Sequence, residues 1–289
     1  MWIYTRARME PGASPTSVAW TEPGPGVRLC HADWLDAART IERGTVHMVY
    51  ADPPFNTGTT RRGAGGAFDD DFGSTGAFIA WLRERLAATV PLLSPAAAVL
   101  MHVDWRTSHH VRLLLDELFG AAGFVNHVVW SYGLGGSSPR RFARKHDDIL
   151  LYSSDPERMY FDPPRVPATS RRMAGRTKKA TDVIDLAASS GRADEADGPV
   201  SDQTAGDVVR VPSINNMARE RVGWPTQKPL ALLELLVRAC CPPGGTVLDP
   251  CCGSGTTLVA ASRLGRRAIG VDVSAEAIAA SRGRLQHGS

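Results

Sequence analysis

The sequence has few of the features that mark membrane, secreted or disulfide-stabilised proteins. No apolar run approaches the roughly 18 residues that a membrane helix needs, and the N-terminus lacks an apolar signal core followed by a cleavage site. Only five cysteines occur in 289 residues. The pairs Cys240-Cys241 and Cys251-Cys252 are adjacent and lack the Cys-x2-Cys spacing of zinc sites. These absences predict a cytoplasmic protein with reduced thiols and no metal.

The chain also lacks a strong overall charge, and its basic residues are concentrated in one block. The formal net charge is +3, yet between Gly133 and Lys179 there are 11 Lys and Arg residues against 5 Asp and Glu. Such a local excess favours a polyanion-binding surface, with a solvated basic surface as the alternative. The candidate phosphate-binding residues are Arg140, Arg141, Arg144, Lys145, Arg171, Arg172, Arg176, Lys178 and Lys179.

Hydrophobic periodicity predicts an α/β protein. Strands are expected at Val27–His31, Val46–Tyr50, Ala97–Val103, Val125–Trp130, Ile149–Tyr152, Thr246–Asp249 and Ala268–Val271. Helices are expected at Phe78–Leu93, Val111–Phe119 and Thr256–Leu264, with two more capped by Thr226 and Ser274. Strands that alternate with helices predict a parallel sheet covered on both faces.

The same pattern divides the chain into four segments. Residues 1–25, rich in Pro, Gly, Ser and Thr, are predicted to form a flexible arm. Residues 26–154 and 225–289 form the two halves of the α/β domain, and residues 155–224, which lack a sustained period, form an insertion. Within the first half, the glycine-rich loop Asn56–Gly73 is expected to be mobile and to close over a ligand.

A glycine-containing turn marks a candidate cofactor site in the last half. Asp249-Pro-Cys-Cys-Gly-Ser-Gly255 follows a predicted strand and precedes a helix, so its backbone N–H groups can approach a ligand. Asp272 ends the next strand, where a carboxylate can accept hydrogen bonds from ribose hydroxyls. A nicotinamide fingerprint needs a third glycine where this chain has Leu258, which argues against an oxidoreductase. A tight turn without a ligand is the other interpretation.

A second motif, Asp52-Pro-Pro-Phe55, directly follows an apolar strand. The prolines fix the backbone and leave carbonyl groups available, while Asp52 supplies an acceptor at the end of the strand, where open α/β sheets bind ligands. A carboxylate and a carbonyl could each accept one hydrogen of an exocyclic amine, and Phe55 offers a flat face for its base. Taken alone, the motif is equally compatible with a proline-rich turn and a solvated Asp.

Together the two motifs resemble the circularly permuted β group of adenine-N6/cytosine-N4 DNA amino-methyltransferases. In that group the Asp-Pro-Pro-aromatic element precedes the recognition region and the glycine loop comes last. The resemblance includes Arg141-Phe-Ala-Arg-Lys-His-Asp147 and Trp224-Pro-Thr-Gln-Lys-Pro229, and it spans roughly Val27 to Leu285.

The resemblance implies a Rossmann-like methyltransferase fold with a seven-stranded, mostly parallel sheet and one antiparallel edge strand, formed by a hairpin that contains Ile149–Tyr152. It makes residues 26–154 the catalytic half, 155–224 the target-recognition region and 225–289 the cofactor-binding half. The chain order further predicts that Val27–His31 lies between these two halves. S-adenosylmethionine is the implied cofactor and double-stranded DNA the substrate. A cognate restriction endonuclease and a homodimer are compatible with the resemblance.

The resemblance also assigns roles to individual residues. Asp52, Pro53, Pro54 and Phe55 are expected to line the target-base pocket. Asp33 is expected near the cofactor's adenine, Lys228 near its carboxylate and Asp272 near its ribose. The remaining cofactor contacts are expected from Asp249, Pro250, Cys251, Gly253, Ser254, Gly255, Thr256 and Thr257. Two positions depart from the family pattern, because Cys251 stands where many members have Phe and Phe55 where Tyr is commoner.

The implied reaction is methyl transfer to adenine N6 by base flipping and direct attack. Cytosine N4 is the alternative target, although family members with that target usually carry Ser in place of Asp52. RNA amino-methyltransferases commonly have Asn-Pro-Pro-aromatic without the permuted order. Cytosine C5 methylation needs a Pro-Cys nucleophile, and here Pro250-Cys251 lies inside the glycine loop. A non-catalytic nucleic-acid-binding protein would not need both motifs. Trp130 is expected to pack in the core, and Tyr132 is a candidate DNA contact.

Overall fold

The computed structural model describes residues 18–132, 138–167, 177–179, 183–185, 209–211, 214 and 220–287. The strands are β1 (Trp20–Gly24), β2 (Val27–His31), β3 (Val46–Ala51), β4 (Thr59–Gly63), β5 (Gly66–Asp70), β6 (Leu93–Val103), β7 (Phe124–Ser131), β8 (His146–Ser153), β9 (Arg165–Pro167), β10 (Thr177–Lys179), β11 (Val183–Asp185), β12 (Val209–Arg210), β13 (Thr246–Asp249) and β14 (Arg267–Asp272). The helices are α1 (Trp34–Ala38), α2 (Thr75–Thr89), α3 (Ser108–Phe119), α4 (Leu230–Cys240), α5 (Thr256–Arg263) and α6 (Ala275–His287), with 3-10 helices η1 (Val90–Leu92) and η2 (Ala121–Gly123).

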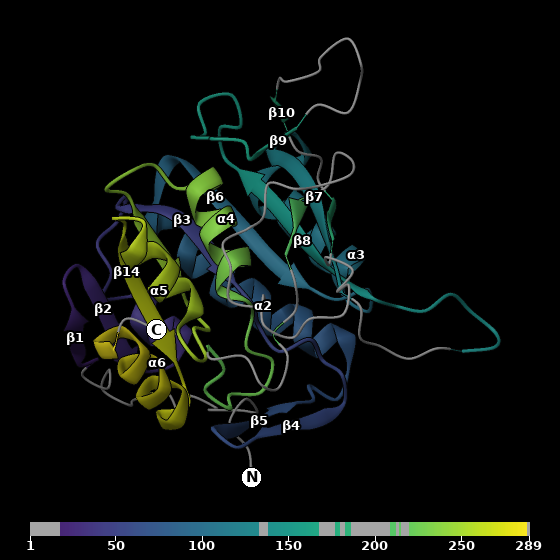
Figure 1. Ribbon diagram of the computed structural model, residues 1–289, viewed down its shortest axis with the longest axis horizontal. Coiled ribbons are helices and arrows are strands. Elements are labelled where there is room, and N and C mark those ends of the chain that lie inside the picture. The colour runs from purple at the N-terminus through teal and green to yellow at the C-terminus, as the bar shows by residue number, and fades with distance from the viewer. Residues whose placement is uncertain are drawn as a thin grey trace.

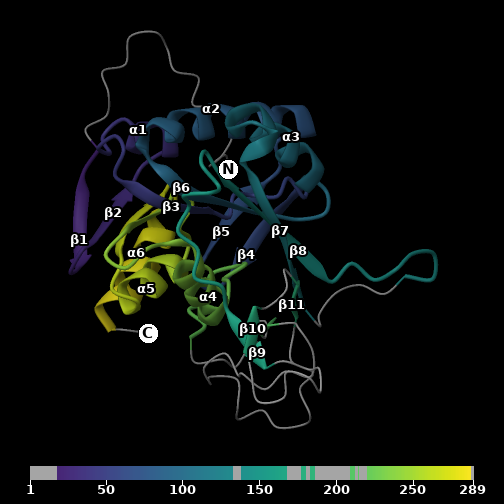
Figure 2. The same ribbon diagram turned by 90° about the horizontal axis from the view of Figure 1, so that it is seen from above.

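A central sheet organises these elements into three layers. In the described residues its order is β1-β2-β14-β13-β3-β6-β8-β7-β11-β12. The pairs β2–β14, β14–β13, β13–β3 and β3–β6 are parallel, whereas β1–β2, β6–β8 and β8–β7 are antiparallel. Helices α1, α2 and α3 cover one face, and α4, α5 and α6 cover the other (Figures 1 and 2). The sequence therefore predicted the α/β class and the two helical layers correctly.

Strand β3 shows why its apolar run forms a central strand. Its successive side chains contribute alternately to two cores, with Met48 and Tyr50 on the α4–α6 side and Val49 and Ala51 on the α1–α3 side. All four are at most 1% exposed. A parallel strand covered on both faces must be apolar at almost every position, because both of its surfaces are buried.

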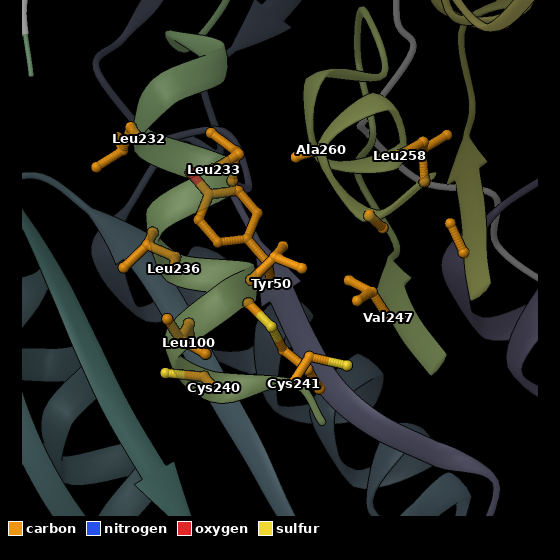
Figure 3. Packing of buried hydrophobic residues seen from close by; sticks show 14 of the residues in the cluster. Tyr50, Leu100, Leu232, Leu233, Leu236, Cys240, Cys241, Val247, Leu258 and Ala260 are labelled. Carbon is orange, nitrogen blue, oxygen red and sulfur yellow. The ribbon is translucent and has the colours of Figure 1, made fainter. Parts of the chain in front are cut away.

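On the α4–α6 side, Tyr50 reaches between two helices (Figure 3). Leu233 and Leu236 of α4 surround it, and Leu258 and Ala260 of α5 belong to the same buried cluster. Burying leucine-sized side chains contributes roughly 1.5–3 kcal/mol each, so this core fixes the two strand ends that carry the motifs. Among the described residues, no helix has the length and apolar character needed to span a membrane.

The strand count and the position of β2 differ from expectation. The sheet has ten strands in the described residues, not seven. Val27–His31 does not lie between the two halves of the domain, because β3 pairs directly with β13 through Met48 and Val247. Strand β2 instead pairs with β14 and β1, near one end of the sheet. Its exposed His31 and half-buried Arg28 suit this position better than one covered on both faces.

The antiparallel strand and the N-terminal arm also require correction. Strand β8, which contains Ile149–Tyr152, lies inside the sheet between β6 and β7, and Asp147–Ser153 is buried. Beyond β7 the insertion adds β11 and β12, so β7 is not an edge either. Residues 20–24, expected to belong to a flexible arm, form β1 against β2 because the turn at Gly26 brings Gly24 opposite Val27.

Two local predictions were wrong for identifiable reasons. Thr226 does not cap α4, because it adopts a left-handed conformation with φ +62°. Pro229 takes the N-cap position, and the Leu230 N–H instead donates to Glu220 Oε2 at 3.0 Å. The segment 56–73, expected to be a loop, instead contains an antiparallel hairpin formed by β4 and β5. By contrast, Ser274 caps α6 as predicted, accepting from the Ala277 N–H at 3.2 Å.

Candidate active site

The two motifs meet at one crevice of the sheet. The segment Asp52–Phe55 follows β3, and the glycine loop Asp249–Gly255 follows β13, the parallel neighbour of β3. The chain proceeds from β13 to β14 on one side and from β3 to β6 on the other, so the strand order reverses between β13 and β3. Open α/β sheets bind ligands at the carboxyl ends of strands at such a switch point.

Asp52 forms an ion pair with a residue from a distant segment. Lys228 Nζ lies 2.5 Å from Asp52 Oδ2 and 5.2 Å from the centroid of the Phe55 ring. The side chains of Lys228 and Asp52 are only 10% and 18% exposed, so removing either charge leaves its partner poorly solvated. The structure therefore brings Lys228, expected near the cofactor's carboxylate, into contact with the acidic residue of the other motif.

A buried network contacts the segment Asp52–Phe55, which we call the tetrad. The ring of His102, on β6, has no exposed surface and stacks on Phe55 with centroids 6.0 Å apart. Its Nδ1 lies 2.7 Å from the Tyr50 hydroxyl, and its Nε2 lies 3.1 Å from Asp147 Oδ2. Burial, followed by the charges of nearby carboxylates, raises the pKa of Tyr50 well above its ordinary value. Tyr50 therefore donates to Nδ1, and Nε2 of His102 donates to Asp147.

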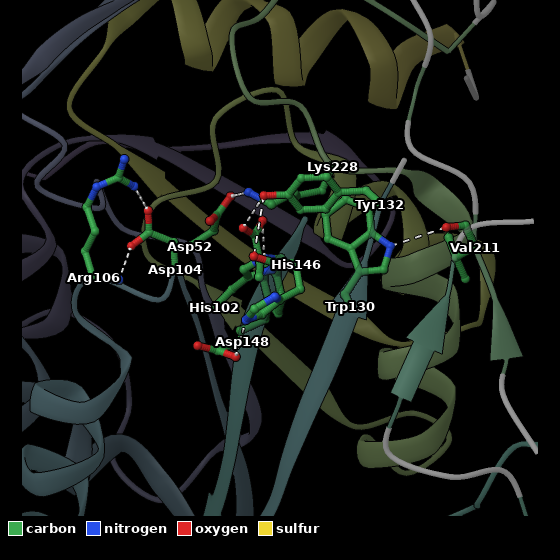
Figure 4. A network of polar contacts seen from close by, with 12 residues as sticks. Asp52, His102, Asp104, Arg106, Trp130, Tyr132, His146, Asp148, Val211 and Lys228 are labelled. Atoms are coloured by element: carbon green, nitrogen blue, oxygen red, sulfur yellow. Dashed lines mark hydrogen bonds and ion pairs between the residues drawn. The ribbon is translucent and has the colours of Figure 1, made fainter. Parts of the chain in front are cut away.

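Asp147 connects this network to the wall of the site, where His102, Tyr132 and Lys228 lie close together (Figure 4). The Tyr132 hydroxyl donates to its Oδ1 at 3.0 Å. Burial acts to raise the pKa of Asp147, but the hydrogen bond from His102, the charge of Lys228 and the hydrogen bond from Tyr132 hold it below its ordinary value. Trp130 is 4% exposed, packs edge-on to His102 at 5.9 Å and donates from Nε1 to the Val211 carbonyl at 3.3 Å. Trp130 is thus a core residue, as predicted.

The glycine loop has the backbone conformation that its sequence predicts. Gly253 and Gly255 have φ values of +50° and +74°, which side-chain-bearing residues rarely adopt. The Gly253 N–H donates to Asp272 Oδ2 at 2.9 Å, and the Cys251 N–H donates to Asp249 Oδ1 at 3.1 Å. These bonds join the loop to the ends of β13 and β14, so both carboxylates lie at the turn.

Buried carboxylates give this part of the site an unusual charge state. Burial is the largest effect on both groups, and it raises the pKa of Asp249 to about 7 and that of Asp272 to about 6. The cavity above the loop is lined by these two residues and Asp52, with Lys228 as the cation among its lining residues. Such a surface favours a ligand that carries positive charge and hydroxyl donors.

The helical side of the loop is held by one arginine. Arg284 on α6 is 2% exposed, and its Nη1 donates to Thr256 Oγ1 at 2.7 Å and to the Ser254 carbonyl at 3.2 Å. Ser254, Thr256 and Thr257 are buried, and all three line the cavity. These three residues therefore border the same space as the loop carboxylates.

Trp224 covers the loop, although sequence reasoning assigned it no role. Its ring is 5% exposed and stacks on Phe68 of the β4–β5 hairpin with centroids 6.3 Å apart. A Cβ atom added at Gly253 would lie 2.9 Å from Trp224 Nε1, and one added at Gly66 would lie 2.5 Å from the same ring. Because glycine has no Cβ atom, the Trp224 ring can approach the backbone this closely at both positions. The hairpin and the C-terminal end of the insertion thus form a roof over the glycine loop.

Asp33 lies at a second, smaller cavity beside the loop. It caps α1, accepting from the Leu35 N–H at 2.8 Å, and its Oδ2 lies 2.7 Å from Arg85 Nη2. The cavity is lined by Asp33, Trp34, Trp81, Arg85, Pro250, Cys251, Asp272 and Val273. Asp272 also lines the cavity above the loop, so the two spaces are adjacent. The structure therefore places the predicted adenine and ribose contacts next to one another.

A cavity of about 700 Å³ opens over the tetrad. Its walls include all four tetrad residues, Asp52 to Phe55, together with Tyr132 and Asp147. Arg61, Arg106, Arg141 and Arg144 also line it, together with Asp70 and Asp104, so its walls carry charges of both signs. Asp52, Pro54, Phe68 and Lys228 line both this cavity and the one above the glycine loop. A ligand in each would meet at Asp52.

The predicted basic block is only partly described. Arg140, Arg141 and Arg144 are exposed and Lys145 is half-buried in the β7–β8 loop. Lys179 is exposed at the end of β10, which also carries Lys178. Arg171, Arg172 and Arg176 lie outside the described residues. Of the nine candidates, Arg141 and Arg144 line the large cavity.

Several residues of the site were missed because their role depends on contacts between distant segments. His102 is the last residue but one of β6, and its local sequence does not distinguish it from a core histidine. Trp105 follows that strand, and Arg144 lies 3.4 Å from its ring centroid. The one available signal was a polar residue, His102, inside a run of apolar residues, since a buried histidine requires hydrogen-bond partners.

Comparison with known proteins gives consistent matches. A family model described as DNA methylase, N6_N4_Mtase, matches residues 46–282. The chain is 27% identical over 251 residues to the DNA adenine methyltransferase YhdJ of Escherichia coli (strain K12), covering 86% of this chain and 79% of that protein. It is 25% identical over 276 residues to the type II methyltransferase M.ScaI of Streptomyces caespitosus, covering 90% and 81%.

Solved structures share the fold. The M1.HpyAVI–SAM complex superposes with a TM-score of 0.57 at 19% identity, covering 90% of this chain and 98% of that chain. The cytosine-N4-specific PvuII DNA methyltransferase gives a TM-score of 0.57 at 14% identity, covering 91% and 93%.

Proposed function

The chain belongs to the family of adenine-N6/cytosine-N4 DNA methylases, and we propose that its target is N6 of adenine in duplex DNA. It is an S-adenosylmethionine-dependent DNA methyltransferase. The observation that carries the proposal is that Asp52 and Pro54 line both the 700 Å³ cavity and the space above the glycine loop, with Pro53 on the wall of the 700 Å³ cavity.

The tetrad can hold an exocyclic amine by its two hydrogens. Lys228 engages Oδ2 of Asp52, so we assign one amine hydrogen to Oδ1 and the other to a proline carbonyl. This arrangement turns the nitrogen lone pair away from both acceptors and fixes the amine without a covalent enzyme intermediate. Phe55, supported by His102, offers a stacking face worth roughly 1–3 kcal/mol per base. Since the amine lies inside the duplex, the base must be flipped out to reach it.

The residues around the glycine loop fit the cofactor. S-adenosylmethionine supplies a methyl group on a positively charged sulfonium, and it also carries an ammonium group and ribose hydroxyls. Asp249 and Asp272 are carboxylates whose pKa values are raised by burial, so a positively charged ligand beside them would stabilise their ionised form. We assign Asp272 to the ribose, Asp33 to the adenine side, and the loop Asp249–Gly255 with Thr256 and Thr257 to the remaining contacts.

The choice of adenine over cytosine rests on Asp52. The fold does not distinguish the two targets, because a cytosine-N4-specific enzyme superposes as well as the M1.HpyAVI complex. YhdJ, whose name specifies adenine, aligns over most of this chain. A carboxylate at this position is the family pattern associated with adenine, whereas Ser is usual for cytosine N4. Cytosine N4 therefore remains the second candidate.

The chain order supports membership of the circularly permuted β group. The tetrad at residues 52–55 precedes the basic segment, and the glycine loop at 249–255 follows it. On this plan, residues 26–154 form the catalytic half, 155–224 recognise the target sequence, and 225–289 form the cofactor-binding half. The basic residues of the block, including Arg171, Arg172 and Arg176, are assigned to DNA phosphates. A cognate restriction endonuclease and a homodimer fit the same plan.

Tritium transfer from labelled S-adenosylmethionine to DNA, followed by nucleoside analysis, tests the proposal. We expect the label in N6-methyladenine. Label in N4-methylcytosine would establish the second candidate, and label in 5-methylcytosine or in RNA alone would refute the assignment of Asp52 to an exocyclic amine of DNA.

A further inference from the structure

The loop between β7 and β8 presents an aromatic side chain entirely to solvent. Phe142 is 97% exposed, whereas the other exposed large apolar side chains of the described residues, Val90, Leu113 and Phe161, are 37%, 66% and 47% exposed. Figures 1 and 2 both show the described part of this loop, residues 138–145, projecting from the body of the protein. Exposure alone does not indicate a function, because single apolar residues are common on protein surfaces. The surroundings of Phe142 are what distinguish it.

Phe142 is surrounded in sequence by cations. Arg140 and Arg141 precede it, Arg144 and Lys145 follow it, and no Asp or Glu occurs between Ser138 and His146. Three of these four cations are exposed, as Phe142 is. Binding to an apolar patch on a second protein would not require so dense a positive charge, whereas binding to a polyanion does.

The loop is also tied to the wall of the active site. The Arg144 guanidinium lies 3.4 Å from the centroid of the Trp105 ring, and the Tyr132 N–H donates to the Lys145 carbonyl at 2.8 Å. Arg141 and Arg144 line the 700 Å³ cavity that contains the tetrad. Phe142 is not itself a lining residue, but it lies between these two arginines in sequence, so its exposed ring is held beside the cavity into which the target base must move.

From this arrangement we propose that Phe142 inserts into the base stack of duplex DNA beside the flipped target base, while Arg141 and Arg144 hold the flanking phosphates. The inference rests on the proposed function. Apolar side chains that enter a base step unstack it and kink the duplex, and cations beside them neutralise the phosphates brought together by the kink. Flipping a base requires loss of its pairing and stacking, so a wedge that fills the gap favours the flipped state.

The test compares paired and mispaired substrates. The methylated site is first mapped by modified-base sequencing, and two synthetic duplexes containing it are prepared, one with the target base paired and one with it mispaired. Phe142→Ala should lower kcat/KM on the paired duplex about tenfold or more and should leave the mispaired duplex within about twofold of wild type, because mispairing already supplies most of the unstacking. Phe142→Leu should recover much of the loss, because it restores an apolar wedge.

A fluorescent base and a matched variant distinguish insertion into the stack from a general loss of surface contact. A 2-aminopurine beside the target base should brighten on binding of the wild-type protein and much less with Phe142→Ala. The matched control is Leu113→Ala, which removes another exposed apolar side chain, on α3. It should leave both kcat/KM and the 2-aminopurine fluorescence unchanged. Equal losses on both duplexes, no loss, or a change of oligomeric state in Phe142→Ala would overturn the inference. If wild-type protein methylates neither duplex, the proposed function fails, whatever the variants do.

Discussion

Replacing Asp52 should lower both the rate of methyl transfer and the free energy of unfolding, and the two effects have different causes. Asp52→Ala removes the acceptor for the amine, and loss of one such hydrogen bond in the transition state costs about a hundredfold or more in rate, equivalent to about 2.7 kcal/mol. It also leaves the Lys228 ammonium, whose side chain is 10% exposed, without the carboxylate 2.5 Å away. We expect the free energy of unfolding to fall by about 1–3 kcal/mol, below the range for fully buried pairs because some solvent reaches both groups.

A double variant distinguishes the two effects. Asp52→Ala combined with Lys228→Met removes both charges, so stability should recover in part while methyl transfer stays at least a hundredfold low. Rates are measured by tritiated methyl transfer, stability by chemical denaturation and cofactor binding by calorimetry. Binding should survive in Asp52→Ala because the glycine loop is intact. Full activity in Asp52→Ala, or recovery of activity together with stability in the double variant, would refute the role given to Asp52.

Three further predictions concern the cofactor loop and the DNA surface. Gly255→Ala should abolish cofactor binding, because its Cβ would lie 2.7 Å from Ser281 Oγ at a φ of +74°. Gly265→Ala is the control, because Gly265 has a similar φ of +70° but no atom lies within 4 Å of an added Cβ, and this variant should still bind the cofactor. Because the pKa of Asp249 is about 7, binding of a cationic ligand displaces a proton from this carboxyl group. The affinity for S-adenosylmethionine, measured by calorimetry, should therefore rise about tenfold from about pH 6 to about pH 8. An affinity that does not change with pH would place the ligand's positive charge elsewhere. Arg140→Ala should lower the salt slope of DNA binding by about 0.9 if it contacts a phosphate, whereas an unchanged slope would make it a solvated residue.

The elements that carry the motifs could be predicted because each is locally determined. Thr246–Asp249 forms β13 with the bounds that the sequence predicts, and Ser274 caps the helix after β14. A fully buried strand must be an apolar run, and a ligand-binding turn after it must contain residues that tolerate unusual φ values. Both requirements are visible within about ten residues of sequence, so Asp52 and Asp249 could be assigned to strand ends without knowing the sheet order.

The sheet order and the roof of the site could not be predicted in this way. The position of β2 depends on which strands pair, and its own five residues are compatible with a central or a peripheral strand. The β4–β5 hairpin contains Gly63, Gly65 and Gly66, which suggested a mobile loop; their small size instead permits contact with residues 222–225. Lys228 pairs with a residue 176 positions earlier, a contact that depends on the whole fold.

Sequencing of cellular DNA with modified-base detection tests the claim that this chain methylates an exocyclic amine of DNA at Asp52. Wild-type protein and Asp52→Ala are expressed in cells whose DNA lacks N6-methyladenine. We predict N6-methyladenine at one short sequence in DNA from cells with the wild-type protein and almost none with Asp52→Ala. DNA without any modified base in the wild-type cells, or the same modification in both, would contradict the claim.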